Sequence, residues 1–232
     1  MYHTNTNIFN AIMKTSHFPE TWKISQIIII PKPGKDVTKV DSYRSISLLP
    51  ILSKLFEKML LQKLKPILHE KKIIPDHQFG FRESHGTVEQ VHRVVSEIRN
   101  SLEQKLYCSA AFLDITQAFD KVWHEGLIYK IRTLLPTSFY AIIKNYLLNR
   151  KFLVKYNSAS TSLHEIYAGV PQGSVLGPVL YLIFTADLPT SNYVKLSTFA
   201  DDTAILAIHQ NPTIASRNLQ EHLDKIEAWL TK

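Results

Sequence analysis

Residues 195–208 read KLSTFADDTAILAI, in which two apolar, β-prone segments flank the adjacent acids Asp201 and Asp202. The pattern predicts a tight hairpin with both carboxylates at its tip. Because side chains alternate along a strand, neighbouring acids gain nothing from a common core face, whereas at a turn both can point toward a cation. Two close carboxylates repel each other, and a divalent metal ion offsets that repulsion. Taken alone, the segment is more typical of a solvated acidic turn than of a metal site.

A further carboxylate ends another apolar strand. Asp114 closes the strand predicted over residues 107–114, just before a turn and a helix, which is a common place for a metal ligand. Asp120 is interpreted equally well as an ordinary carboxylate at a helix start. Asp114, Asp201 and Asp202 together suit two-metal phosphoryl transfer, since Mg²⁺ prefers a few carboxylates plus substrate phosphates. Such catalysis is mostly positioning and charge neutralisation.

Several loops add groups that bind phosphate or bases. The basic loop PKPGKD, residues 31–36, joins strands predicted over 22–30 and 43–49, and is a candidate triphosphate grip, although Lys35 and Lys39 fit solvated surface residues. Residues 77–82, HQFGFR, can stack on or grip a nucleic-acid strand through aromatics such as Phe81 and through Arg82. Phe79 and Phe81 are interpreted equally well as anchors of the loop in the core. The glycine-rich segment 168–178 permits close approach of its backbone to a ligand. Packing does not explain a glutamine at position 172, between Pro171 and Gly173.

A helix is predicted to begin where Thr87 and Gln90 match a capping box. Its apolar positions repeat with helical spacing and form one apolar face of the helix. That face consists of Val88, Val91, Val95, Ile98 and Leu102.

Composition narrows the class of protein. The 232 residues are 45% hydrophobic, which argues against disorder, and the net charge of +7 favours an anionic partner, nucleic acid first. One cysteine, Cys108, excludes an internal disulfide and a Cys-based zinc site. The N-terminus is polar and no apolar stretch approaches the roughly 20 residues of a membrane helix. We therefore expect an intracellular protein of the cytoplasm or nucleus, with no membrane partner.

An ordered series of motifs resembles the reverse-transcriptase domain of a non-LTR retrotransposon, most similar to the jockey-like elements of insects. One such motif is weak, whereas the ordered set along nearly the whole chain is highly specific. The motifs are FPETWK (18–23), IPKPGK (30–35), SYRSISLL (42–49), QFGFR (78–82), FLD (112–114), AFDKVWH (118–124), GVPQGS (169–174) and FADD (199–202).

The resemblance implies an α+β fold of the right-hand polymerase type, whose palm is an antiparallel sheet backed by helices. Residues 1–106 would form mainly fingers and residues 107–232 mainly palm, within one reverse-transcriptase domain. The motif positions imply the following roles: Asp114, Asp201 and Asp202 as catalytic metal ligands, Ile115 as a backbone carbonyl ligand, Lys32 and Arg44 as triphosphate ligands, Phe119 as the side chain that blocks a ribose 2′-hydroxyl, and Gln172 and Gly173 as the loop against nucleotide and template–primer.

The implied activity is RNA-directed DNA polymerisation with two Mg²⁺ ions, for which Mn²⁺ can substitute, acting on an RNA template, a DNA primer and dNTPs. A non-catalytic nucleic-acid-binding remnant of a degraded element is the alternative, and a nucleotide cyclase has no support beyond the acidic turn. Ser45 stands where the family usually has Pro, and Gly86 where it often has Ser. Since the chain ends before the primer grip and thumb and shows no endonuclease domain, we expect it to polymerise poorly alone.

Overall fold

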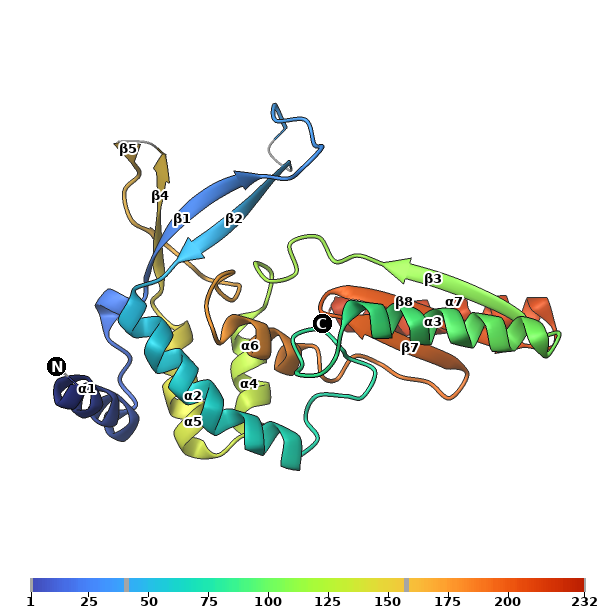
Figure 1. Cartoon of the computed structure of the whole chain (residues 1–232), viewed down its shortest axis with the longest axis horizontal. Helices are drawn as coiled ribbons and strands as arrows, with labels where there is room; N and C mark the ends of the chain where they lie inside the picture. Colours follow the sequence, from blue (N-terminus) through green and yellow to red (C-terminus); the bar gives the residue numbers. More distant parts are fainter. Residues whose placement is uncertain (1, 40–41, 157–158, 232) are drawn as a thin grey trace. The chain divides into compact units, whose positions relative to one another are not determined.

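The computed structural model describes residues 2–39, 42–156 and 159–231. They divide into two compact units, each built from two separate stretches of chain (Figure 1). Unit 1 comprises Met1–Ile73 and Gln117–Phe184, and unit 2 comprises Ile74–Thr116 and Thr185–Lys232. Helices and sheets occur in both units, which confirms the α+β class. The assignment of residues 1–106 to fingers and 107–232 to palm stays a prediction.

Unit 1 holds a mixed sheet with the strand order β2-β1-β4-β5, in which β6 also pairs with β4. Strands β1 and β4 run parallel, and the other pairs are antiparallel. The strands are β1 Ile24–Pro31, β2 Tyr43–Leu48, β4 Lys151–Tyr156, β5 Ala159–Ser160 and β6 His164–Glu165. The predicted pair of strands around the basic loop is thus confirmed as the β1–β2 ribbon.

The helices of unit 1 contribute apolar side chains to its core. In α2, Phe56, Leu60 and Leu64 recur every fourth residue and are fully buried, as helical periodicity requires. Phe18 packs edge-on against Phe56 and Tyr146, with ring centroids 5.8 and 5.1 Å away. The helices are α1 Tyr2–Thr15, α2 Ile51–Glu70, α4 His124–Leu134, α5 Thr137–Leu147 and α6 Gly177–Phe184, with a short 3₁₀ turn at Glu20–Trp22.

Unit 2 is a three-stranded antiparallel sheet in the order β3-β8-β7, contacted by the helices α3 and α7. Alternate residues of β7 and β8 pack against α7 in one core, as expected for a sheet with a helix on its face. The elements are α3 Thr87–Glu103, β3 Tyr107–Leu113, β7 Val194–Phe199, β8 Asp202–His209 and α7 Pro212–Leu230. The core residues are Val194, Leu196, Ile205, Ala207, Leu219 and Ile226. This confirms the prediction of an antiparallel sheet backed by helices.

One prediction for α3 was wrong. The helix begins at Thr87, but its cap pairs Gly86 with Glu89, whose carboxylate accepts the Gly86 N–H at 2.8 Å. Gln90 points into the unit instead and is buried. The apolar face of the helix is largely at the surface, since Val88, Val91, Val95 and Leu102 are all more than half exposed.

Candidate active site

The acidic hairpin forms as predicted. Ala200 and Asp201 connect β7 to β8, and Asp202 opens β8 opposite Phe199. On the other side of β8, Leu113 of β3 pairs with Thr203, so the chain reaches Asp114 directly beside the start of β8. Antiparallel pairing therefore brings Asp114 to the same end of the unit 2 sheet as Asp201 and Asp202, although Asp114 and Asp201 are 87 residues apart in sequence (201 − 114).

The charges of this acidic cluster repel one another. Burial raises the pKa of Asp201, and the negative charges of Asp202 and Asp114 raise it further. In the described ranges, no three acidic, His or Cys side chains converge closely enough to hold a metal ion as they stand. The donors nevertheless fit a hard divalent cation, because all are carboxylate oxygens and a cation would relieve the repulsion at Asp201. Ile115 follows Asp114 and is half-buried.

The loop before α3 lies against this hairpin. Phe79 packs edge-on against His85 at 4.6 Å and beneath the Arg93 guanidinium at 4.8 Å, so this aromatic anchors the loop. Phe81 is 54% exposed and adopts a left-handed φ of +57°. Arg82 is half-buried, and its Nη1 donates to the carbonyls of its own loop. Phe81 thus presents a surface ring, whereas Arg82 braces the loop.

Unit 1 carries the predicted nucleotide-binding residues. In the β1–β2 ribbon, Ile30 pairs with Arg44, and the Lys32 N–H donates to the Ser42 carbonyl at 2.7 Å. Lys32 and Arg44 therefore lie at the same end of the ribbon, and the Arg44 side chain is exposed. Two cations at one end of a hairpin can pair with the oxygens of a polyphosphate.

Phe119 is stacked on Tyr181 of α6, with ring centroids 4.8 Å apart and planes 14° apart. Its carbonyl accepts the Val170 N–H at 2.8 Å, and burial raises the pKa of the neighbouring Asp120. Gly169 (φ +91°) has no room for a side chain, because a Cβ would lie 2.8–3.0 Å from the Asp120 backbone. The Phe119 segment and the glycine-rich segment thus form one packed structure.

The loop that holds Gln172 and Gly173 is fixed to β2. The Gln172 carbonyl accepts the Ser47 N–H at 2.8 Å, and a Cβ on Gly173 (φ +117°) would lie 2.7 Å from the Ser47 oxygen. The Gln172 side chain itself is exposed. The glycines predicted close approach of this backbone to a ligand. In the structure, the Gly173 backbone closely approaches Ser47 of the β1–β2 ribbon.

A buried carboxylate on α2, a helix with no predicted chemistry, anchors the other end of this loop. Glu57 is fully buried and accepts the N–H groups of Val175 at 2.8 Å and Leu176 at 3.1 Å, and the Ser53 hydroxyl at 2.9 Å. Burial raises the pKa of Glu57, and the fully buried Arg150 opposes that shift. Sequence reasoning missed this residue, whose signal was an acid that interrupts the apolar face of an amphipathic helix.

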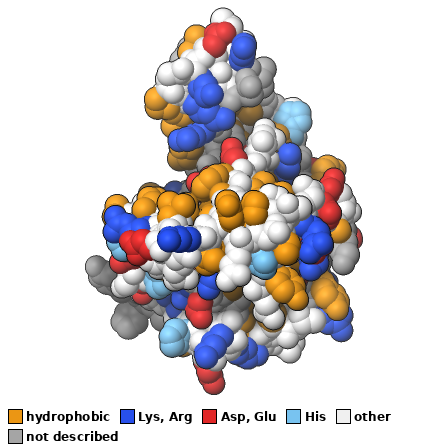
Figure 2. Space-filling view, turned by 90° about the vertical axis from the view of Figure 1, so that its right-hand side faces the viewer, with side chains coloured by type: hydrophobic (Ala, Val, Ile, Leu, Met, Phe, Trp, Pro, Cys, Tyr) orange, Lys and Arg blue, Asp and Glu red, His pale blue; other side chains and the backbone are white. Residues whose placement is uncertain are grey.

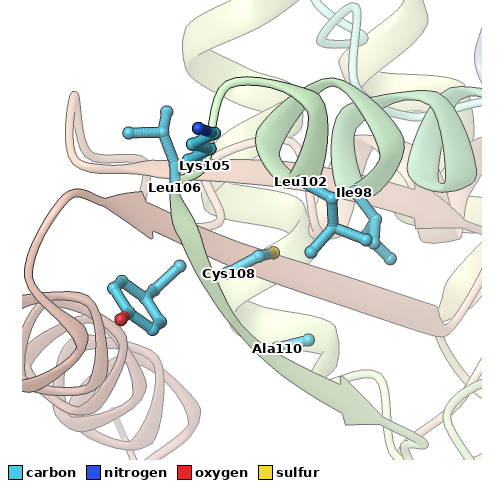
Figure 3. Close-up of a pocket in the computed structure, with 7 residues that line it drawn as sticks. Ile98, Leu102, Lys105, Leu106, Cys108 and Ala110 are labelled. Atoms are coloured by element: carbon cyan, nitrogen blue, oxygen red, sulfur yellow. The ribbon is translucent and has the colours of Figure 1, made fainter.

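An apolar groove lies at the opposite end of β3 from Asp114. It has a volume of about 480 Å³, and Ile98 and Leu102 of α3 face Cys108 and Ala110 of β3 across it (Figure 3). Cys108 is a free thiol whose pKa is raised by burial and by Glu97. Figure 2 looks onto this end of unit 2, where Lys and Arg side chains are scattered among hydrophobic and acidic ones.

Solved structures define the class of fold. The structure of apo telomerase from Candida tropicalis aligns with a TM-score of 0.62 and 15% identity, and the alignment covers 97% of this chain and 46% of the telomerase chain. Telomerase of Candida albicans, in complex with a TWJ fragment of telomeric RNA, aligns with a TM-score of 0.58 and 12% identity. The alignment covers 96% of this chain and 43% of the telomerase chain. The fold is that of a right-hand polymerase, as predicted.

Sequence comparison gives the family. Residues 30–232 match the model of the family Reverse transcriptase (RNA-dependent DNA polymerase), and the chain belongs to this family. It is 47% identical to a probable RNA-directed DNA polymerase from transposon BS and 46% identical to the RNA-directed DNA polymerase from mobile element jockey, both of Drosophila melanogaster. Both alignments cover 96% of this chain, which spans about a quarter (25%) of each relative.

These comparisons confirm the predicted likeness to jockey-like elements. Reverse transcriptases as a family generally use divalent metal ions. Among the described residues, no helix is both long and apolar enough to cross a membrane.

Proposed function

We propose that this chain carries the polymerase site of a non-LTR retrotransposon's RNA-directed DNA polymerase. The reaction is transfer of a nucleotide from a dNTP to a DNA primer 3′-hydroxyl, directed by an RNA template. The observation that carries the proposal is the position of Asp114, Asp201 and Asp202 at one end of the unit 2 sheet, where burial and the negative charges of the other two acids raise the Asp201 pKa. Repelling carboxylates of this kind suit a site that neutralises them with metal ions.

The acidic cluster would hold two Mg²⁺ ions, or Mn²⁺ in their place. Asp114, Asp201 and Asp202 would supply the carboxylate ligands and Ile115 its backbone carbonyl. When bound, such ions supply a Lewis acid for the attacking and leaving oxygens. Asp201 is half-buried, so solvent screens the attraction between its carboxylate and a cation only in part.

The residues of unit 1 would bind the incoming nucleotide. Lys32 and Arg44 neutralise the triphosphate, and Phe119, held rigid by its stacking on Tyr181, excludes a ribose 2′-hydroxyl. Gln172 faces solvent from an anchored loop, so it is free to contact the nucleotide, while Gly173 lies against the template–primer. In unit 2, Phe81 would contact the template–primer by stacking, and Arg82 braces the loop that carries Phe81.

Primer extension on an RNA template tests the proposal. We expect Mg²⁺-dependent extension that Asp201→Asn lowers by about 10³-fold or more, because a lost metal ligand removes several kcal/mol of transition-state stabilisation. Asp224→Asn, which changes an exposed acid on α7 of the same unit, is the matched control and should extend like the unaltered chain. Extension that is equal in Asp201→Asn and the unaltered chain would contradict the proposal.

The second candidate, a non-catalytic nucleic-acid-binding remnant, is favoured only by the net charge of +7. A protein that binds RNA chiefly through Lys and Arg loses affinity steeply as salt rises. RNA binding together with Asp201-dependent extension would exclude this candidate.

A further inference from the structure

One buried amide holds the turn that carries Asp201. Gln78 is 4% exposed, and its Oε1 accepts the N–H groups of Ala200 at 2.9 Å and Gly80 at 2.7 Å. Its Nε2 donates to the Ala200 carbonyl at 3.1 Å. A single side chain therefore satisfies both backbone polar groups of the residue before Asp201.

Ala200 needs this support because of its conformation. Its φ of +56° lies in the left-handed region, which costs a residue with a Cβ about 1 kcal/mol or more. Such a conformation persists when surrounding contacts determine it. The two bonds from Gln78 to Ala200 supply such contacts from outside the hairpin.

The backbone around Gln78 is fitted to the same turn. The Phe79 N–H donates to the Thr198 carbonyl, and the Thr198 N–H donates to the His77 carbonyl, both at 2.9 Å. A Cβ on Gly80 would lie 2.1 Å from the Ala200 nitrogen, so only glycine permits this approach. The loop thus pairs with the end of β7 and places the Gln78 amide against the turn.

The chemistry of an amide suits this place. An amide both donates and accepts, as the two backbone groups of Ala200 require, and it carries no charge. A carboxylate here would add a further negative charge beside Asp201 and Asp202, and an ammonium group would pair with those acids and compete with a metal ion. Glutamine therefore holds the turn without changing its electrostatics.

We propose that Gln78 is a positioning residue, which holds the Ala200 turn so that the Asp201 carboxylate is presented to a divalent metal ion. The inference rests on the proposed function, because it needs Asp201 to bind metal. It adds a role for the first residue of the QFGFR segment that is distinct from contact with nucleic acid.

Gln78→Met tests the proposal, with Gln90→Met as its matched control. Gln90 is also a buried glutamine (5% exposed), and its Nε2 donates to the carbonyls of His77 and Thr198 at 2.9 Å each, so it braces the same loop at the base of the turn. Both variants keep side-chain length and lose buried hydrogen bonds, but only Gln78→Met removes the bonds to Ala200. A general loss of packing would therefore affect both.

Two readouts are measured on the full chain. Hydrogen exchange of the peptide spanning residues 199–203 reports the turn, and Mn²⁺ titration followed by electron paramagnetic resonance reports the metal site. We expect Gln78→Met to increase exchange and to weaken Mn²⁺ binding by about tenfold to 100-fold, as for other residues that orient metal ligands. Gln90→Met should change Mn²⁺ affinity by less than about threefold.

Equal Mn²⁺ affinity in Gln78→Met and the unaltered chain, or equal losses in both glutamine variants, overturns the positioning role. Failure of the proposed function looks different. In that case the unaltered chain shows no Mn²⁺ binding that Asp201→Asn removes, although exchange at residues 199–203 still rises in Gln78→Met. The kinetic signature of positioning is a fall in kcat with an unchanged KM for dNTP.

Discussion

The two units hold their candidate site loops by opposite means. In unit 2, the Asp201 turn is held by Gln78, a neutral amide. In unit 1, the loop after Gln172 is held by Glu57, a buried carboxylate that accepts two backbone N–H groups and has the buried Arg150 nearby. Each anchor reaches its loop from a segment more than 100 residues away, with sequence separations of 122 and 118–119 residues.

The difference follows from the charge that each loop presents. A carboxylate accepts two N–H groups strongly, and its desolvation is tolerable in unit 1 because Ser53 and Arg150 offset part of it. Beside the acidic cluster of unit 2, the same group would increase repulsion that already raises the Asp201 pKa. A side chain that holds a loop beside an acidic metal site, such as Gln78, is therefore best uncharged. A side chain that holds a loop without charged groups, such as Glu57, can be ionised.

The largest expected effect comes from Gly80→Ala, because the Gln78 loop can approach the Asp201 turn only where residue 80 has no side chain. Gly80→Ala places a methyl group 2.1 Å from the Ala200 nitrogen, so the loop and the hairpin must separate. We expect the free energy of unfolding to fall by about 3 kcal/mol and primer extension to fall more than tenfold. Urea denaturation and primer extension measure the two effects.

The control for that glycine is Gly86→Ala. Gly86 has a φ of −97°, and a Cβ would approach only the Glu89 carboxylate, at 4.0 Å. Its substitution should change unfolding by no more than about 0.5 kcal/mol. Equal effects at the two glycines would refute the close approach of Gly80 to the hairpin.

Glu57→Gln is the next largest change and tests the ionic anchor. The variant weakens the bonds to Val175 and Leu176 and leaves Arg150 buried without its counter-charge. We expect unfolding to become easier by about 2 kcal/mol, because hydrogen bonds to charged groups contribute about 1.5–3 kcal/mol each and the amide retains part of them. Urea denaturation measures the change, with Glu70→Gln at the exposed end of α2 as the control. A loss no larger than that of the control would show that the charge of Glu57 is dispensable.

These anchors also mark the limit of prediction from sequence. The Asp201 hairpin and the Asp114 strand end were predicted, because strand alternation and turn composition are local signals. The anchoring roles of Gln78 and Glu57 were not, because their bonds join residues more than 100 positions apart, and no local pattern shows which loop each side chain reaches.

The helix α3 shows how such distant bonds override a local rule. Thr87 and Gln90 match a capping box, yet Glu89 caps the helix, and Gln90 is used in bonds to His77 and Thr198. The periodic valines form one apolar face of the helix, and on this face Val88 is 81% exposed. Periodicity identifies the apolar face of a helix correctly without identifying what, if anything, covers it.

A smaller effect is expected on the pH dependence of the free energy of unfolding at Asp201. The pKa of Asp201 is raised in the folded state above its ordinary value of 3.8, so the folded state loses stability as pH rises through the raised pKa. Asp201→Asn should therefore unfold less readily than the unaltered chain near neutral pH, by less than about 1 kcal/mol because solvent screens a half-exposed site. The difference should disappear below pH 3.8.

Mg²⁺ sharpens this test. Added Mg²⁺ should stabilise the unaltered chain and not Asp201→Asn, so the difference near neutral pH should shrink or reverse. The effect of Glu57→Gln should not depend on Mg²⁺, since that carboxylate is fully buried and bonded to the loop backbone. Urea denaturation with and without Mg²⁺ measures both, and a Mg²⁺-independent Asp201 effect would contradict a metal-binding role for the acidic cluster.

The smallest effect on stability is expected at Gln172. Its backbone carbonyl carries the bond to Ser47, while its side chain is exposed, so Gln172→Ala keeps the anchored loop and removes only the group that faces solvent. We expect the free energy of unfolding to change by less than about 0.5 kcal/mol, while the KM for dNTP rises severalfold. Urea denaturation and dNTP titrations of primer extension measure the pair. A stability loss as large as that of Glu57→Gln would mean that the side chain anchors the loop. An unchanged KM would mean that the loop is anchored for a purpose other than contact with the nucleotide through Gln172.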